Sequence, residues 1–160
     1  MGLDFQFPGP AHGTYVLLLD LGSNFRGAVG ALGVVSLPLG RYCYVGSAHG
    51  PGGLGARLGR HLRGPARSHW HVDHLAGHVS ALGWLWVEGD ERLECRWVQT
   101  LLSLPGATAP ARGFGASDCA RGCAAHLVML PPGAVESDVL AALVAATPGE
   151  LVVRRSGPGG

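Results

Sequence analysis

One carboxylate stands out because it falls among apolar side chains. Residues 91–104 have the periodicity of an amphipathic helix, which Pro105 and Gly106 end. At 100° per residue the apolar side chains fill an arc of about 200°, and Glu94 is the only polar residue inside it. A carboxylate that faces a core is costly unless it pairs with a cation or binds a metal ion. Two interpretations of Glu94 are therefore open, a metal ligand or the partner of an arginine on another element.

A second candidate group lies on a predicted helix over residues 54–62. Leu54, Leu58 and Leu62 recur at four-residue spacing and form its expected buried stripe. Arg57 and His61, one turn apart, flank that stripe and are placed to look across a sheet edge into a cleft. The plainer alternative is that both side chains only cover apolar surface with their stems.

The three tyrosines all fall on predicted strands. Tyr15 opens a strand over residues 14–20, and Tyr42 and Tyr44 share one face of a strand over residues 42–47. A buried tyrosine is a common core residue whose hydroxyl finds one partner, so strand position alone does not separate a structural from a chemical role.

The basic residues are unevenly distributed. All 12 are arginine, and residues 21–72 contain six of them with no Asp or Glu, whereas the rest of the chain carries a net charge of −5. A biased genome could explain the missing lysines, but it does not explain the missing acids. Guanidinium groups match phosphate oxygens bidentately, so this stretch indicates an anionic partner. Its arginines are Arg26, Arg41, Arg57, Arg60, Arg63 and Arg67.

Histidines and cysteines form two further groups, one over residues 69–78 and one over residues 119–126. The first contains His71, Asp73, His74 and His78, and the second contains Cys119, Cys123 and His126. Neither shows a recognised four-ligand zinc spacing. The favoured interpretation is that His69 and Asp73 orient each other or contact a sugar-phosphate backbone, and that the two thiols are half-buried small side chains. A zinc-binding structural domain is the weaker alternative.

Size and composition are those of a single globular domain. The chain has 160 residues, of which 47% are hydrophobic and 14% are charged, so neither disorder nor a solvated coiled coil is expected. The longest apolar run, residues 139–146, is far shorter than the roughly 20 residues that span a bilayer. Residues 1–10 show no secretory signal, so a cytoplasmic protein with reduced cysteines and no membrane partner is expected.

The elements that must position these residues alternate irregularly. Strands are predicted over residues 14–20, 33–37, 42–47 and 83–88, with a turn at 38–40 and a last strand or extended segment over 125–130. Helices are predicted over residues 54–62, 69–79, 91–104 and 135–146, followed by a loose tail over 156–160. This pattern predicts an α+β domain built on a small sheet.

Five motifs in order resemble the GIY-YIG nuclease superfamily. They begin with Gly13-Thr14-Tyr15, Tyr44-Val45-Gly46, Leu54-x-x-Arg57-x-x-x-His61 and Glu94. The likeness is nearest to a small microbial subfamily, sometimes fused to endonuclease III-type repair enzymes, whose further hallmarks match residues 69–73, 92–95 and 113–119. Each motif alone is weak, but the set is specific and covers residues 13–130. It implies an N-terminal arm (1–12), a nuclease-like domain (13–130), and a C-terminal helix with a flexible tail (131–160).

The resemblance implies a metal-dependent endonuclease that hydrolyses DNA phosphodiester bonds, in repair or processing. Its fold would be an antiparallel sheet with a three-stranded core, extended or not, flanked by helices. Tyr15 would help to activate the attacking water with support from Tyr44, Arg57 would hold the scissile phosphate, and His61 would be a secondary polar contact. Glu94 would be the single protein ligand of Mg²⁺, with Mn²⁺ as an alternative. Residues expected to contact nucleic acid are Ser47, Arg60, Arg63, Arg67 and His69.

The sequence departs from the superfamily pattern in three places. The first motif reads Gly-Thr-Tyr, which keeps the tyrosine. The 28 residues between Tyr15 and Tyr44 are more than compact members have, and an added hairpin strand over 33–37 accounts for them. The late asparagine of some members has no evident counterpart. A non-catalytic nucleic-acid-binding or adaptor module on the same fold is the alternative function, and either a monomer or a weak dimer is compatible with the sequence.

Overall fold

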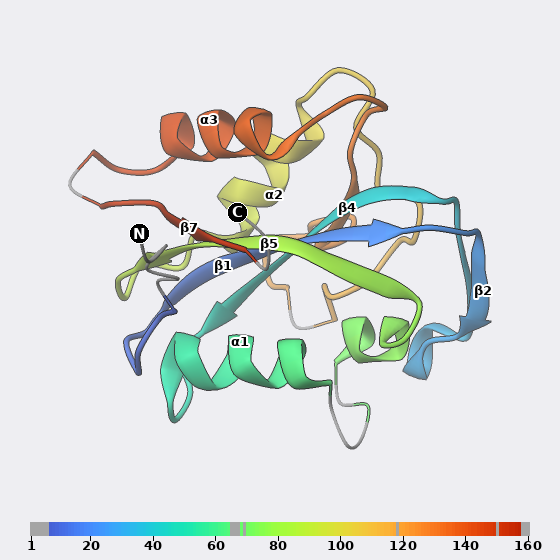
Figure 1. The fold of residues 1–160 in the computed structure, drawn as a ribbon, viewed down its shortest axis with the longest axis horizontal. Helices are drawn as coiled ribbons and strands as arrows, with labels where there is room; N and C mark the ends of the chain where they lie inside the picture. Colours follow the sequence, from blue (N-terminus) through green and yellow to red (C-terminus); the bar gives the residue numbers. More distant parts are fainter. Residues whose placement is uncertain (1–6, 65–67, 69, 118, 150, 158–160) are drawn as a thin grey trace, which may run out of the picture.

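The strand predicted at residues 14–20 is the central strand of the molecule. In the computed structural model, which describes residues 7–64, 68, 70–117, 119–149 and 151–157, β1 (Gly13–Leu21) is almost entirely buried. It is the middle strand of a five-stranded antiparallel sheet of order β6-β4-β1-β5-β7 (Figure 1). The other strands are β4 (Gly40–Ala48), β5 (Val79–Glu88), β6 (Leu127–Met129) and β7 (Arg154–Ser156).

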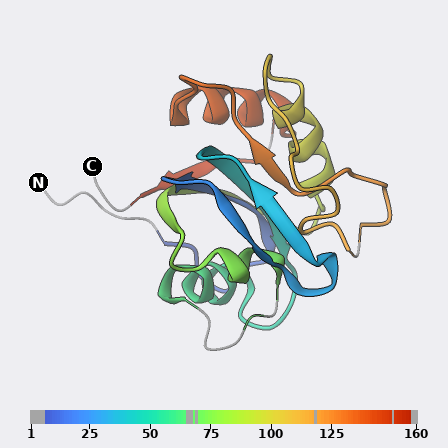
Figure 2. The same ribbon diagram turned by 90° about the vertical axis from the view of Figure 1, so that its right-hand side faces the viewer.

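Helices cover both faces of this sheet, so the domain has three layers (Figures 1 and 2). Helix α1 (Gly53–Arg63) packs on one face, and α2 (Glu94–Leu102) and α3 (Glu136–Ala146) pack on the other. Alternate residues of β1 point to opposite faces. Leu17 therefore belongs to the core under α1, and Val16 to the core under α2 and α3. The fold is α+β, as predicted.

Helix α1 matches the predicted helix closely, with one exception in its stripe. Leu54 and Leu58 are fully buried, but Leu62 is 36% exposed because it lies in the last turn of the helix. The preceding residues hold the other end of the helix, since the carbonyls of Gly9 and Ala11 accept hydrogen bonds from the N–H groups of Gly55 (2.8 Å) and Leu54 (2.9 Å). Thus part of the N-terminal arm provides partners for the first turn of α1.

The strand predicted at residues 33–37 exists, but its partner differs from the expected one. β3 (Val34–Leu37) pairs with β2 (Phe25–Ala28) in a separate two-stranded sheet, and not with the strand that follows residues 38–40. A short 3₁₀ helix, η1 (Gly30–Leu32), connects them. Phe25, Val35 and Leu37 insert into the core on the α1 side, which anchors this hairpin to the domain.

The prediction of a helix over residues 69–79 is wrong. The chain forms a 3₁₀ helix, η2 (His71–Leu75), turns at Gly77 (φ 84°), and enters β5 at Val79. Val72 and Leu75 are the apolar anchors of this segment, and their three-residue spacing suits a 3₁₀ helix. β5 is thus longer than the predicted strand 83–88.

Two further boundaries differ from the prediction. Helix α2 begins at Glu94 and not at residue 91, and the N–H of Leu93, just before it, donates to the Thr14 hydroxyl on β1 (3.2 Å). Ser156, expected in a loose tail, pairs with Trp84 as part of β7, and residues 158–160 lie outside the described residues. Within the described ranges, no helix has the length and apolar character needed to cross a membrane.

Candidate functional site

A cavity of about 610 Å³ opens where the outer edge of β4 loses its neighbouring strand. β6 pairs with β4 only through Tyr42, Cys43 and Tyr44, and residues 44–47 of β4 border the cavity. Four of the five expected catalytic residues line this cavity together with Ser47: Tyr15, Tyr44, Arg57 and Glu94. Motifs that are far apart in the sequence therefore meet at one place.

The phenol of Tyr15 reaches the cavity by lying across Gly46 on the neighbouring strand. The two residues are register partners, and a Cβ built at Gly46 would lie 2.5 Å from the Tyr15 hydroxyl oxygen. No side chain larger than hydrogen fits there without moving the phenol. Steric exclusion by the Tyr15 phenol thus explains why the last residue of the Tyr44-Val45-Gly46 motif is glycine.

Behind Tyr15, a series of buried polar groups leads away from the cavity. Its hydroxyl lies 2.8 Å from Nε2 of His61, and His61 Nδ1 lies 3.8 Å from Asp73 Oδ1. The side chains of His61 and Asp73 are 4% and 1% exposed. The Asp73 carboxylate also accepts the N–H of Trp70 (2.9 Å) and pairs with Arg60 (3.2 Å). His61 does not line the cavity itself, and its hydrogen bond to Tyr15 connects it to the cavity wall.

Burial sets the charge states of His61 and Tyr15. It lowers the pKa of His61 to about 4, with Arg57 and Arg60 adding to the effect and Asp73 opposing it. It also raises the pKa of Tyr15 to about 12 against the influence of Arg57, and it raises the pKa of Tyr44. At neutral pH, Tyr15 is thus a neutral phenol beside a neutral imidazole. When the neutral imidazole carries its proton on Nδ1, which faces Asp73, its Nε2 atom accepts a hydrogen bond from the Tyr15 hydroxyl.

The buried imidazole predicts a specific loss of stability in acid. An unfolded histidine has a pKa near 6.5, above the folded value of about 4, so the unfolded state binds more protons as pH falls through this window. The contribution of neutral His61 to the free energy of unfolding is fully present above about pH 6.5 and is lost as the pH falls to about 4. When the pH is lowered from about 7.5 to about 5, we expect the free energy of unfolding to fall by about 2 kcal/mol because of His61.

Denaturant unfolding at the two pH values measures this effect. In a His61→Gln variant, the loss between the two pH values should be smaller by about 2 kcal/mol, because glutamine does not titrate. An equal loss in the parent and the variant would contradict the assignment of the acid sensitivity to His61.

Arg57 is held in place on two sides. Its Nη1 donates to the carbonyl of Ser47 (3.1 Å), and its guanidinium lies 4.1 Å from the centre of the Trp70 ring. Arg60 lies 4.3 Å from the same ring centre, so Trp70 stacks with both arginines. Arg57 faces the cavity, whereas Arg60, expected to contact nucleic acid, pairs with Asp73 and does not line it.

Glu94 projects into the cavity from the first turn of α2. Its Oε2 atom is buried and has no hydrogen-bond partner within the described part of the chain. Arg57 and Arg92 line the same cavity, yet among the described residues no arginine forms an ion pair with Glu94. Of the two interpretations that the sequence left open, this geometry favours a ligand for a bound cation over a salt-bridge partner.

Of the remaining predicted residues, only Arg63 is described by the structure, and it does not line the cavity. Arg63 is exposed at the end of α1, and Arg67 and His69 lie outside the described residues. The other members of the group over residues 69–78 face different partners: His71 accepts the N–H of Gly115 (2.8 Å), and His78 packs against Phe25.

Sequence reasoning missed several residues of the site. Trp70 was not selected, and Asp73 was selected only as a partner of His69 or of a sugar-phosphate backbone, whereas in the structure it contacts Arg60 and His61. These contacts with α1 are long-range and leave no spacing signal. The cavity wall also contains residues that sequence reasoning did not select for this site: His49, Arg92, Cys95, Arg121 and His126.

Comparison with known proteins places this site within one family. No curated protein and no solved structure gives a significant match to the chain. The model of one family matches residues 14–147, a range that includes every residue around the cavity. On this match, the chain belongs to the family described as domain of unknown function DUF123.

Proposed function

We propose that this protein is a metal-dependent endonuclease that hydrolyses DNA phosphodiester bonds, on a fold similar to that of the GIY-YIG nucleases. The observation that carries the proposal is the meeting of Tyr15, Tyr44, Arg57 and Glu94 around one cavity. The antiparallel β4-β1-β5 core with helices on its faces is also the arrangement that the motif resemblance implies, with β6 and β7 as extensions.

The donor set suits a hard divalent cation. Glu94 offers a carboxylate oxygen that is buried and has no protein partner among the described residues, and the open cavity beside it leaves room for water and substrate oxygens. Mg²⁺ is usually bound by one or two carboxylates together with water and phosphate oxygens. When bound, such an ion would polarise the phosphate and stabilise the charge that develops on it.

The other side chains have roles that follow from their contacts. Arg57, fixed by Ser47 and Trp70, can direct its remaining N–H groups at a phosphate oxygen. Tyr15 can orient the attacking water and give its own proton to His61 as it accepts one from the water. Tyr44 lies in the same wall, and its ring packs edge-on against His61 (5.9 Å between ring centres), the hydrogen-bond partner of Tyr15, so it can support Tyr15 through His61.

The charge of the cavity supports an anionic substrate. Its wall contains three arginines, Arg57, Arg92 and Arg121, and one carboxylate, Glu94. A cleft lined mainly by one sign of charge concentrates ligands of the opposite sign. Arg63 extends the positive charge along α1, so a phosphodiester backbone can follow this surface.

A cleavage panel tests the proposal. Single-stranded, duplex, nicked and branched DNA, with RNA as a comparison, are incubated with the purified protein and Mg²⁺ or Mn²⁺. We expect cleavage of at least one DNA substrate that EDTA abolishes. Binding without cleavage of any substrate would overturn the nuclease proposal in favour of a non-catalytic nucleic-acid-binding module.

The contact between Gly46 and Tyr15 gives a prediction for the same assay. Gly46→Ala should displace the Tyr15 hydroxyl and break its bond to His61, and a misplacement of about 1 Å can reduce turnover by about 10²-fold. The matched control is Gly22→Ala, because a Cβ at Gly22 meets no atom within 4 Å. Parental cleavage by the Gly46→Ala protein would show that the position of the phenol does not matter.

A further inference from the structure

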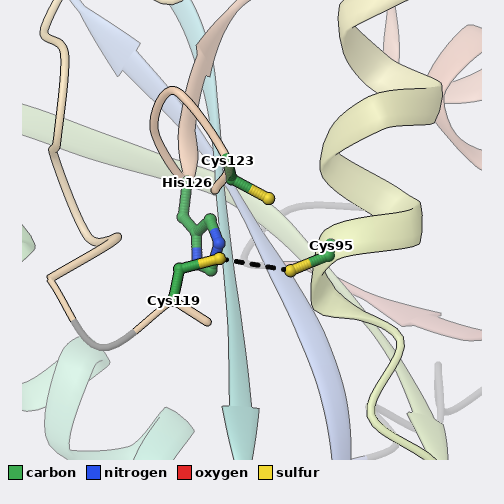
Figure 3. Close-up of side chains that lie close together, drawn as sticks. All are labelled: Cys95, Cys119, Cys123 and His126. Carbon is green, nitrogen blue, oxygen red and sulfur yellow. Dashed lines mark hydrogen bonds between the residues drawn. The ribbon is translucent and has the colours of Figure 1, made fainter. Parts of the chain in front are cut away.

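Three cysteines and one histidine converge at the edge of the cavity (Figure 3). Cys95 comes from the first turn of α2, and Cys119, Cys123 and His126 come from the connection between α2 and β6. One potential ligand atom of each lies within 4.8 Å of those of the other three. The sulfurs of Cys95 and Cys119 are 3.4 Å apart.

These distances are those of a preformed tetrahedral metal site. Sulfur ligands of zinc lie about 2.3 Å from the ion, so two of them are separated by about 3.7 Å along a tetrahedron edge. We propose that Cys95, Cys119, Cys123 and His126 bind one Zn²⁺ ion. All four positions of the tetrahedron are then protein ligands, which is the mark of a structural and not a catalytic zinc site.

The state of the histidine is an independent observation for this site. His126 is only 7% exposed, and its Nε2 atom is buried without a hydrogen-bond partner in the parts of the chain described. Its backbone is fixed, since its N–H donates to the carbonyl of Phe114 (2.7 Å) and its carbonyl accepts the N–H of Val45 (2.9 Å). A buried ring nitrogen without a partner is costly, and a bound metal ion would remove that cost.

The neighbours of the sulfurs also suit metal-bound thiolates. Gln99 on α2 directs its Nε2 at the Cys123 sulfur (3.9 Å). Three thiolates and a neutral imidazole around Zn²⁺ carry a net charge of −1, and Arg92 and Arg121 lie in the same cavity wall to balance it. Such outer partners are a usual part of metal sites.

The connection that supplies three of the ligands has little apolar burial along its middle part. Residues 103–126 contain no regular helix or strand within the described range, and no described residue between Phe114 and Ala125 is buried. Apolar burial therefore anchors its two ends but not the segment between them. A zinc ion would tie this segment to α2 and so fix one wall of the cavity next to Glu94.

Metal analysis tests the proposal independently of any nuclease activity. The full chain is expressed with zinc in the medium, purified under reducing conditions without chelator, and analysed by elemental mass spectrometry. We expect about one zinc per chain. Replacement by Co²⁺ should give the thiolate-to-cobalt charge-transfer and tetrahedral ligand-field bands, and removal of zinc should lower the melting temperature, because metal binding is coupled to folding.

Two cysteine variants make the test specific. Cys119→Ser should reduce the zinc content to less than about a tenth of an ion per chain. Cys43→Ala should keep the parental content, because Cys43 is buried in the core of the sheet and is not part of the cluster.

Three results would overturn the proposal. One is parental zinc content in the Cys119→Ser protein. The second is reduced, zinc-reconstituted parent protein that retains no zinc and gives no cobalt–thiolate band, a measurement that needs no variant to fold. The third is peptide mapping that shows a disulfide between Cys95 and Cys119 in the protein purified under reducing conditions.

Discussion

Replacing Glu94 with glutamine is expected to abolish DNA cleavage while leaving DNA binding intact. Glutamine keeps the size of the side chain but removes the charge that would hold Mg²⁺, and loss of the several kcal/mol that a metal ion supplies corresponds to at least about 10³-fold in turnover. Binding should persist because the arginines of the cavity and of α1 supply it. The fold should be equally or slightly more stable, since a buried carboxylate atom without a partner is a cost.

Glu91→Gln is the matched control for this variant. Glu91 lies three residues earlier, its side chain is 51% exposed, and its only ion pair in the described structure is a 4.0 Å contact with Arg96. It should cleave like the parent protein. If Glu94→Gln instead melted markedly lower and still cut DNA when folded, Glu94 would be the partner of an arginine and not a metal ligand.

Replacing Tyr15 with phenylalanine is expected to reduce turnover by about 10²-fold or more, the scale of general acid–base assistance. The ring stays in the core, so the fold should lose only the hydrogen bond to His61, about 1 kcal/mol. Single-turnover cleavage at saturating Mg²⁺ and denaturant unfolding measure the two effects separately.

Tyr42→Phe separates the chemistry from the hydrogen bond. Tyr42 is as buried as Tyr15, and its hydroxyl donates to the carbonyl of Pro38 (2.6 Å) away from the cavity. Both variants should lose similar stability, and only Tyr15→Phe should lose activity. Equal activity in the two variants would return Tyr15 to a purely structural role.

The elements that the sequence predicted correctly are those with a strong local pattern. β1 is apolar on both faces and could only be a central strand, and the leucines of α1 recur every four residues, so burial of one face fixes a helix there. The prediction for residues 69–79 was wrong because this segment has too few apolar residues to distinguish a 3₁₀ helix from an α-helix. β7 has only three residues, and its pairing with β5 is a long-range contact that local spacing does not encode.

For the candidate site, too, the sequence indicated individual residues, and the tertiary structure determined how they are arranged. From the sequence, Glu94 was selected because it breaks an apolar pattern, whereas Tyr15, Tyr44 and Arg57 were selected as site residues by the resemblance of their motifs to the GIY-YIG nucleases. That they share one cavity is a result of tertiary structure, which aligns Tyr15 with Gly46 and places the start of α2 beside them.

Only the tertiary structure decided which side chains support these residues. Asp73 lies near His61, and the Trp70 ring contacts both Arg57 and Arg60, through contacts between α1 and a segment that follows it in the chain. Cys95 joins Cys119, from a position 24 residues earlier, because α2 packs beside the connection to β6. The spacing of residues within a segment indicates which face of a helix or strand is buried. Contacts between elements depend on how the whole core packs, and no single segment contains that information.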